Sequence, residues 1–253
     1  MNYQNPILPG FHPDPSICRA GEDFYLVTST FEFYPGVPVY HSRNLVNWEL
    51  LGYCMTEENG LSLRESGPSG GIYAPTIRYH DGMFFMITTN VSDKGNFIVY
   101  TEDPKKGWSK PQWVEQGGID PSLFWDDDGK VYFVSTGHDG EGRCTIDMCE
   151  VNPFTGEMLS ETVTLSYGCG GKYPEGAHLY KRDGTYYLMM AEGGTEYGHM
   201  ETIQRADKPY GPYESCPHNP VLTHRDDTKG DIHCTGHADL VEEIGRASCR
   251  ERV

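Results

Sequence analysis

Apolar side chains along this chain occur in short runs that are separated by turn residues such as Gly, Asp, Asn and Pro. The runs are rich in Tyr, Phe and Val, which favour β-strands. Helical spacing, with apolar residues at i, i+3 and i+4, does not persist over ~12 residues anywhere without an interrupting Gly or Pro. The pattern therefore predicts an all-β protein.

One sequence pattern occurs repeatedly. Each copy has a small or acidic residue, two small residues or Pro, an apolar strand, a turn with Gly or Asp, and an aromatic strand. The copies are DPSICRAGEDFYLV from Asp14, APTIRYHDGMFFMI from Ala74, DPSLFWDDDGKVYFV from Asp120, EGAHLYKRDGTYYLM from Glu175 and a partial fifth, HADLVEE, from His237. Their starts are 60, 46, 55 and 62 residues apart. Internal repeats of this length indicate a chain built from similar structural units.

Each copy predicts a β-hairpin, because an apolar strand and an aromatic strand flank a short turn. Further strands follow the hairpins, for example in VPVYHSRNLVNWEL and NFIVYTEDPKKGWSK. Such units, repeated four or five times, are typical of a β-propeller with four strands in each blade. A large β-sandwich is the alternative all-β fold, but it does not require the same residues to recur at the start of each unit.

The repeat also predicts which residues meet. The innermost strand of each propeller blade lines the central channel, so residues at equivalent repeat positions lie on one ring. Three residues of this ring are carboxylic acids, namely Asp14, Asp120 and Glu175. We expect these acids to converge at one mouth of the channel.

Converging carboxylates can perform acid–base chemistry. Repulsion and partial burial raise the pKa of one acid while another stays ionised, which supplies a general acid and a general base at one pH. This pair is what hydrolysis of a glycosidic bond requires. A separation of ~6.5–9.5 Å leads to inversion and ~5–5.5 Å to retention at the anomeric carbon. The same three acids could instead bind a hard cation such as calcium.

Sugar sites also need aromatic faces. Phe31, Phe33, Tyr34 and Tyr73 lie near the expected channel mouth, and Gly, Ser and Pro surround Phe31 and Tyr73 in particular. For any single aromatic residue of a β protein, a place in the core is the alternative interpretation. The chain contains no GxSxG, P-loop or GxGxxG motif.

Charge and composition limit the classes of molecule that the protein is expected to bind. The formal net charge of −17 disfavours nucleic acid and anionic membrane surfaces, so a neutral or cationic ligand fits better. No apolar run approaches the ~20 residues of a spanning helix, and the first residues lack a signal peptide, which predicts a cytoplasmic protein. The eight cysteines have no zinc-site spacing, so we expect reduced thiols and no metal site of that kind.

The last ten residues, IGRASCRERV, differ from the acidic, aromatic chain before them. They match the in-frame translation of a common sequencing adapter. We therefore expect a glycosidase-sized domain at residues 1–243 and a tail at residues 244–253 that is foreign to it.

Five segments resemble glycoside hydrolase family 43, specifically its β-xylosidase branch. They are NPILPGFHPDPSICR, GGIYAPTIRYHDGMFF, GGIDPSLFWDDDGKVYFV, PEGAHLYKRDGTYYLMMAEGGT and TGHADLV. The resemblance runs from residue 2 to about residue 243. It implies a five-bladed β-propeller, here with the fifth blade incomplete. It also implies sequence beyond this chain: the rest of blade five, a substrate-contacting Arg and a β-sandwich domain.

The resemblance implies a role for each acid. Asp14 of HPDPS would be the general base that activates water, and Glu175 of PEGAH the general acid. Asp120 of IDPS would adjust the pKa of the acid and orient it. The family needs no cofactor in its chemistry.

The resemblance also implies substrate-binding residues. Phe31 and Tyr73 would border the xylose subsite, and Thr195 of EGGTE would line the site. His237 of GHAD would lie under the sugar in the channel, beside water or a bound calcium ion.

We therefore expect an inverting exo-β-xylosidase that releases xylose from the non-reducing end of β-1,4-xylo-oligosaccharides, with α-L-arabinofuranosidase side activity. The alternatives are a non-catalytic carbohydrate-binding propeller, which would not need all three acids, and an inactive fragment of the enzyme. An oligomer of the complete protein is left open.

Overall fold

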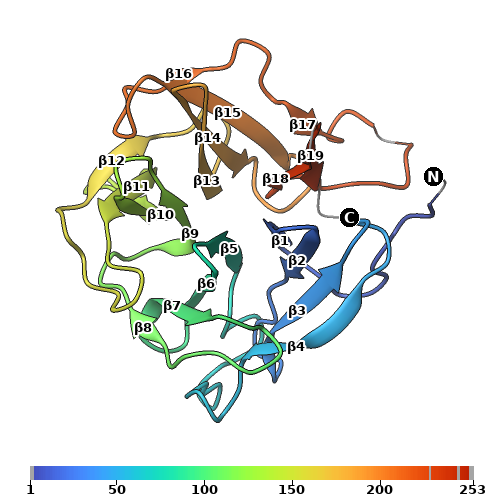
Figure 1. The fold of residues 1–253 in the computed structure, drawn as a ribbon. Helices are drawn as coiled ribbons and strands as arrows, with labels where there is room; N and C mark the ends of the chain where they lie inside the picture. Colours follow the sequence, from blue (N-terminus) through green and yellow to red (C-terminus); the bar gives the residue numbers. More distant parts are fainter. Residues whose placement is uncertain (1–2, 228, 244–245, 251–253) are drawn as a thin grey trace.

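The computed structural model describes residues 3–227, 229–243 and 246–250, and every regular element in these ranges is a β-strand. The strands form four sheets of four or five strands each and a separate two-stranded pair. The sheets are arranged around a common centre (Figure 1). Within the described residues, no helix has the length and apolar character for crossing a membrane.

Each sheet is one blade, numbered here in chain order. Blade one contains β1 (Ser16–Ala20), β2 (Asp23–Val27), β3 (Gly36–Ser42) and β4 (Glu49–Met55). Blade two contains β5 (Thr76–His80), β6 (Met83–Asn90), β7 (Gly95–Thr101) and β8 (Gln112–Trp113). Blade three contains β9 (Ile119–Trp125), β10 (Val131–His138), β11 (Cys144–Glu150) and β12 (Val163–Ser166). Blade four contains β13 (Glu175–Arg182), β14 (Thr185–Glu192), β15 (Met200–Ala206) and β16 (Glu214–Ser215), with β17 (Leu222–Thr223) also paired to β15. The remaining pair is β18 (Asp239–Glu243) with β19 (Arg246–Arg250).

The four complete repeats coincide with the four hairpins β1–β2, β5–β6, β9–β10 and β13–β14. In two of them, Asp81-Gly82 and Asp183-Gly184 form the turn with positive φ at both residues. This is the backbone of the two-residue turn that matches strand twist, and Asp-Gly is a preferred sequence for it. The prediction of an all-β propeller is confirmed, and four of the five predicted blades are present among the described residues.

The innermost strands surround the central axis in chain order. Contacts link β1 to β5, β5 to β9 and β9 to β13, and β18 lies against β1 (Figure 1). The tail that we predicted to be foreign falls partly outside the described residues, at 244–245 and 251–253. The backbone between them pairs with β18, with Leu240 opposite Cys249.

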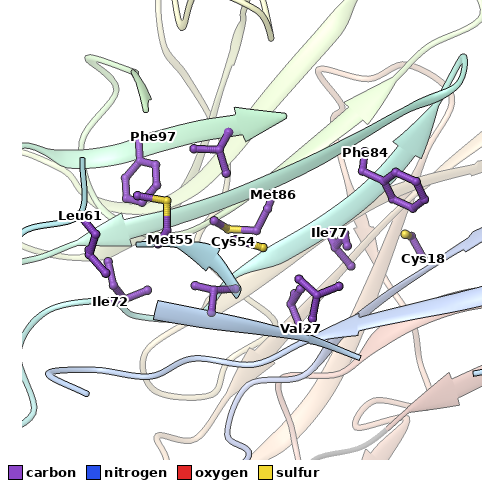
Figure 2. Close-up of a cluster of buried hydrophobic side chains, with 13 residues drawn as sticks. Cys18, Val27, Cys54, Met55, Leu61, Ile72, Ile77, Phe84, Met86 and Phe97 are labelled. Atoms are coloured by element: carbon purple, nitrogen blue, oxygen red, sulfur yellow. The ribbon is translucent and has the colours of Figure 1, made fainter. Parts of the chain in front are cut away.

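The hydrophobic core lies between neighbouring blades. Figure 2 shows Val27 and Met55 of blade one packed with Ile77, Met86 and Phe97 of blade two. Equivalent clusters join blade two to blade three, through Phe85, Ile98, Leu123 and Phe133, and blade three to blade four, through Tyr132, Ile146, Leu179 and Leu188. Because every cluster draws on two sheets, each blade depends on its neighbours.

A buried carboxylate joins the ring at its axis. Asp239 of β18 is fully buried, and its Oδ2 accepts hydrogen bonds from Ser16 Oγ at 2.5 Å and from Arg78 Nη1 at 2.7 Å. Its Oδ1 accepts a hydrogen bond from the Tyr180 hydroxyl at 2.7 Å. One side chain therefore connects β18 to blades one, two and four.

The charges of this network are balanced. Burial opposes ionisation of Asp239, but the Arg78 charge, the nearby His178 and the hydrogen bonds from Arg78 and Ser16 together outweigh it and hold the pKa of Asp239 well below its usual range. Arg78 Nη2 also donates to His178 Nδ1 at 2.9 Å. Burial lowers the pKa of His178 to about 3, so the ring is neutral at pH 7 and offers a lone pair to Arg78.

We expect Asp239→Asn to lower the free energy of unfolding by about 3–5 kcal/mol, because it leaves the buried Arg78 charge without its counter-ion. The measurement is urea denaturation of the complete protein, with the sequence that the family resemblance implies beyond residue 243. Asp183→Asn is the control, since the Asp183 side chain is 95% exposed and asparagine tolerates its left-handed backbone. A loss below about 1 kcal/mol at Asp239 would contradict the argument.

We expect His178 to make the protein acid-sensitive. Its folded pKa of about 3 lies below the ~6.5 of an unfolded histidine, so the unfolded chain binds the proton first as pH falls. The contribution of neutral His178 to the free energy of unfolding is fully present above pH ~6.5. It declines by ~1.4 kcal/mol per pH unit towards pH ~3. The test measures the free energy of unfolding of the complete wild-type protein and of its His178→Gln variant at pH 7 and at pH 5. The fall between the two pH values should be ~2 kcal/mol larger in the wild type. Equal losses in the two proteins would exclude His178 as the source.

Candidate active site

The three predicted acids lie at one end of the innermost strands. Asp14 precedes β1, Asp120 is the second residue of β9, and Glu175 begins β13. Asp14 and Asp120 have φ values of 53° and 54°, and the equivalent His237 has 55°. Non-glycine residues rarely adopt this left-handed conformation, so its recurrence at one repeat position shows that the backbone itself repeats there.

Asp120 has a strongly raised pKa. It is 7% exposed, and burial, the charge of Glu175 and the charge of Asp14 together raise its pKa well above the usual range. The backbone N–H of Gly176 donates a hydrogen bond to Asp120 and partly opposes this rise. Asp120 therefore lies within the electrostatic reach of both other acids.

The surroundings of Asp14 are polar. Its Oδ2 accepts a hydrogen bond from Ser29 Oγ at 2.6 Å, and its Oδ1 lies 3.7 Å from His237 Nδ1. The His237 ring lies against Gly176, where an added Cβ would be 2.6 Å from the ring. Glycine at this position is therefore what allows His237 to come between Asp14 and the residue that follows Glu175.

The two aromatic residues predicted to border the sugar lie together. The ring centroids of Phe31 and Tyr73 are 5.6 Å apart at 65°, and Phe11 packs against the other side of Phe31 at 6.0 Å. Phe31 and Tyr73 are half-buried, whereas Phe33 and Tyr34 are exposed. Phe31 N donates to Ile72 O at 2.8 Å, which joins these two aromatic segments through the backbone.

Thr195 lies in the exposed loop between β14 and β15. This loop follows Glu192, and the preceding residue, Ala191, pairs with Glu175. The structure therefore places Thr195 at the same end of blade four as the predicted general acid.

The described residues contain no cluster of typical metal ligands. Among them, no group of three or more His, Cys, Asp or Glu side chains is arranged to hold a metal ion. On the axis, the carboxylate of Asp239 is bound by Arg78. A calcium ion needs six to eight oxygen ligands. Waters can supply most of these ligands, so the calcium ion that the resemblance implies stays a prediction.

A cavity of about 770 Å³ lies at the opposite end of the innermost strands. Its lining includes Arg19, His80, Trp125, Lys181 and Glu242, which follow the starts of their strands by several residues. This cavity is the other mouth of the channel and does not contain the three acids.

Sequence reasoning missed Ser29, Arg78 and Asp239. A signal for Asp239 existed in the repeat, because it occupies the position of Ser16, Thr76, Ser122 and Ala177 in the other copies. A charged residue at a position otherwise held by small residues indicates a special contact. Ser29 and Arg78 carry no comparable signal.

The comparisons with known proteins agree with this geometry. The family model described as glycosyl hydrolases family 43 matches residues 3–247. A non-reducing end α-L-arabinofuranosidase of Bacteroides ovatus is 47% identical over 244 residues, which cover 95% of this chain and 45% of that protein. A xylosidase/arabinosidase of Butyrivibrio fibrisolvens is 47% identical over 252 residues, covering 95% and 48%.

Solved structures give the same result. A xylan β-1,4-xylosidase from Bacillus halodurans superposes with a TM-score of 0.91 at 39% identity, covering 96% of this chain and 49% of that one. The chain thus spans about half the length of the relatives that it matches. The motifs, the four blades and the family match lead to one conclusion: the chain belongs to glycosyl hydrolase family 43.

Proposed function

We propose that the protein hydrolyses glycosidic bonds by single displacement with inversion at the anomeric carbon. The observation that carries the proposal is the position of Asp14, Asp120 and Glu175 at one end of the innermost strands, where burial and the charges of Glu175 and Asp14 raise the pKa of Asp120. Three acids within one another's fields at a channel mouth cost stability, and such perturbed groups are typical of catalytic sites. This cost disfavours the alternative of a non-catalytic binding propeller.

Each acid has one role in the proposed reaction. Asp14 takes a proton from water as the water oxygen attacks the anomeric carbon, and Ser29 holds the Asp14 carboxylate by its hydrogen bond. Glu175 gives its proton to the glycosidic oxygen as the bond to the anomeric carbon breaks. Asp120 accepts the N–H of Gly176 and so positions the backbone beside the acid.

The proposed substrates are β-1,4-xylo-oligosaccharides, cleaved from the non-reducing end to release xylose. The paired rings of Phe31 and Tyr73 offer apolar surfaces to a sugar, and the relatives named xylosidase/arabinosidase support this class. α-L-Arabinofuranosidase activity is the second candidate, because the relative from Bacteroides ovatus carries that name. Thr195 and His237 complete the proposed subsite.

The proposal extends to the fold and to the domain. We assign β18 to the inner strand of a fifth blade, since it lies against β1 and its Asp239 reaches the axis. Residues 1–243 would then be part of a five-bladed propeller domain, and residues 244–253 a tail foreign to it. The complete protein, meaning this chain with the sequence that follows residue 243 in its gene, would finish the blade.

We expect the 253-residue chain alone to be insoluble or dynamic and inactive, and the complete protein to unfold cooperatively. Leaving out ~400 Å² of inter-blade contact costs on the order of 10 kcal/mol, which rivals the stability of a whole domain. Thermal unfolding followed by near-UV circular dichroism compares the two. A soluble, cooperatively melting and active 253-residue chain would overturn the five-blade assignment.

We expect Asp14→Ala and Glu175→Ala to fail differently in the complete protein. Loss of the base should lower kcat/KM by ~10²–10⁴-fold on every substrate, because water must always be activated. Loss of the acid should cost as much on xylobiose but far less on p-nitrophenyl β-xyloside, whose leaving group needs little protonation. The release of reducing sugar measures the rate on xylobiose, and nitrophenol absorbance measures the rate on p-nitrophenyl β-xyloside. Equal losses on both substrates for Glu175→Ala would contradict the assignment of the acid.

A further inference from the structure

Blade four contains a carboxyl group that the proposed reaction does not use. Glu192 is the last residue of β14 and is fully buried. Its Oε1 accepts hydrogen bonds from Cys169 N at 2.6 Å and from Thr202 Oγ1 at 2.7 Å, and its Oε2 accepts one from Gly171 N. Both oxygens are therefore acceptors, and two of the three donors are backbone amides.

These two amides belong to the loop that leads to the predicted acid. Residues 167–174 join β12 to β13, and Glu175 follows directly. Gly193, the neighbour of Glu192, donates its N–H to Lys172 O at 2.6 Å. The end of β14 thus holds this loop at positions 169, 171 and 172, close to the residue that must place its proton on the leaving oxygen.

The glycines of the loop fit around this carboxyl group. A Cβ at Gly171 would lie 2.5 Å from Glu192 Oε2, and Gly168 has a φ of 88° with its Cβ position 3.2 Å from Glu192 Cδ. A side chain at position 171 would displace the carboxyl group. The loop sequence and Glu192 therefore form one contact unit.

The strand pairing carries this contact to Glu175. Glu175 pairs with Ala191, which precedes Glu192 on β14. The acid is thus fixed on one side by the sheet and on the other by the loop that Glu192 holds. A change in the loop would alter the backbone at Glu175, while the pairing of the rest of β13 with β14 would remain.

We propose that Glu192 is a positioning residue for the general acid Glu175. It acts through the loop at residues 167–174 and touches no substrate. The inference rests on the proposed function, because it concerns proton donation to the leaving group. It predicts that a defect at Glu192 depends on how much protonation the leaving group needs.

The chain offers a matched control in the same blade. Glu201 of β15 is also fully buried, and its Oε2 accepts a hydrogen bond from Ala238 N at 3.0 Å. The backbone N–H of His237 also donates to this carboxyl group. Glu201 thus bonds to a different segment, and the same substitution there does not release the loop before Glu175.

The experiment compares Glu192→Gln and Glu201→Gln in the complete protein. The substrates are xylobiose, whose sugar leaving group needs protonation, and 2,4-dinitrophenyl β-xyloside, whose leaving group does not. In Glu192→Gln, an amide NH₂ faces backbone N–H donors, which releases part of the loop before Glu175. We expect kcat/KM on xylobiose to fall about 30-fold or more. On the dinitrophenyl substrate, kcat/KM should fall about threefold or less. Glu201→Gln should change both values by the same factor.

The outcomes separate the two proposals. A wild-type protein that cleaves neither xyloside nor arabinofuranoside overturns the proposed function and this inference with it. An active wild type in which Glu192→Gln loses equally on both substrates, or in which Glu201→Gln shows the same selectivity, overturns the inference alone. If Glu192→Gln does not fold, Glu192→Asp keeps both acceptor oxygens on a shorter side chain, and an equal loss on both substrates in that variant is equally decisive against it.

Discussion

The arrangement of the innermost strands depends on one buried ion pair. Asp239 and Arg78 neutralise each other at the axis, and further hydrogen bonds of the pair reach Ser16, Tyr180 and His178. Asp239 has no exposed surface and the Arg78 side chain is only 16% exposed, so each charge is stabilised mainly by the other. The hydrophobic cluster of Ile17, Phe24 and Val241 joins β18 to blade one, and the ion pair adds links from β18 to blades two and four. The innermost strands in turn position the three acids Asp14, Asp120 and Glu175.

Blade four has the largest share in organising the site. Its first strand supplies Glu175, its second ends at Glu192, and its third contains Glu201, which bonds to the segment beside β18. Two buried carboxyl groups in one sheet are unfavourable for stability unless they bond to something specific. Both bond to backbone N–H groups of segments that have no regular structure. Blade four therefore orders the irregular parts of the chain next to the three acids.

The sequence predicted the elements that are encoded locally. The Asp-Gly turns, such as Asp81-Gly82, specify a hairpin within a few residues, and repetition of the hairpin placed the acids on one ring. Contacts between distant residues were not predictable in this way. Asp239 and Arg78 are 161 positions apart, and Glu192 bonds to backbone amides that leave no residue signature. The far cavity was missed for the same reason, because its lining comes from all the innermost strands.

The left-handed backbone at Asp14 and Asp120 joins chemistry and folding in one residue type. Aspartate and asparagine accept this conformation more readily than other side chains with a Cβ, whereas β-branched residues do not. Few substitutions at these two positions therefore preserve the backbone of the innermost strands. A change to asparagine or glycine removes the carboxylate and leaves a folded propeller, which is a short route from a hydrolase to a sugar-binding protein. A change to valine would strain the left-handed backbone and destabilise the blade, so selection would remove it.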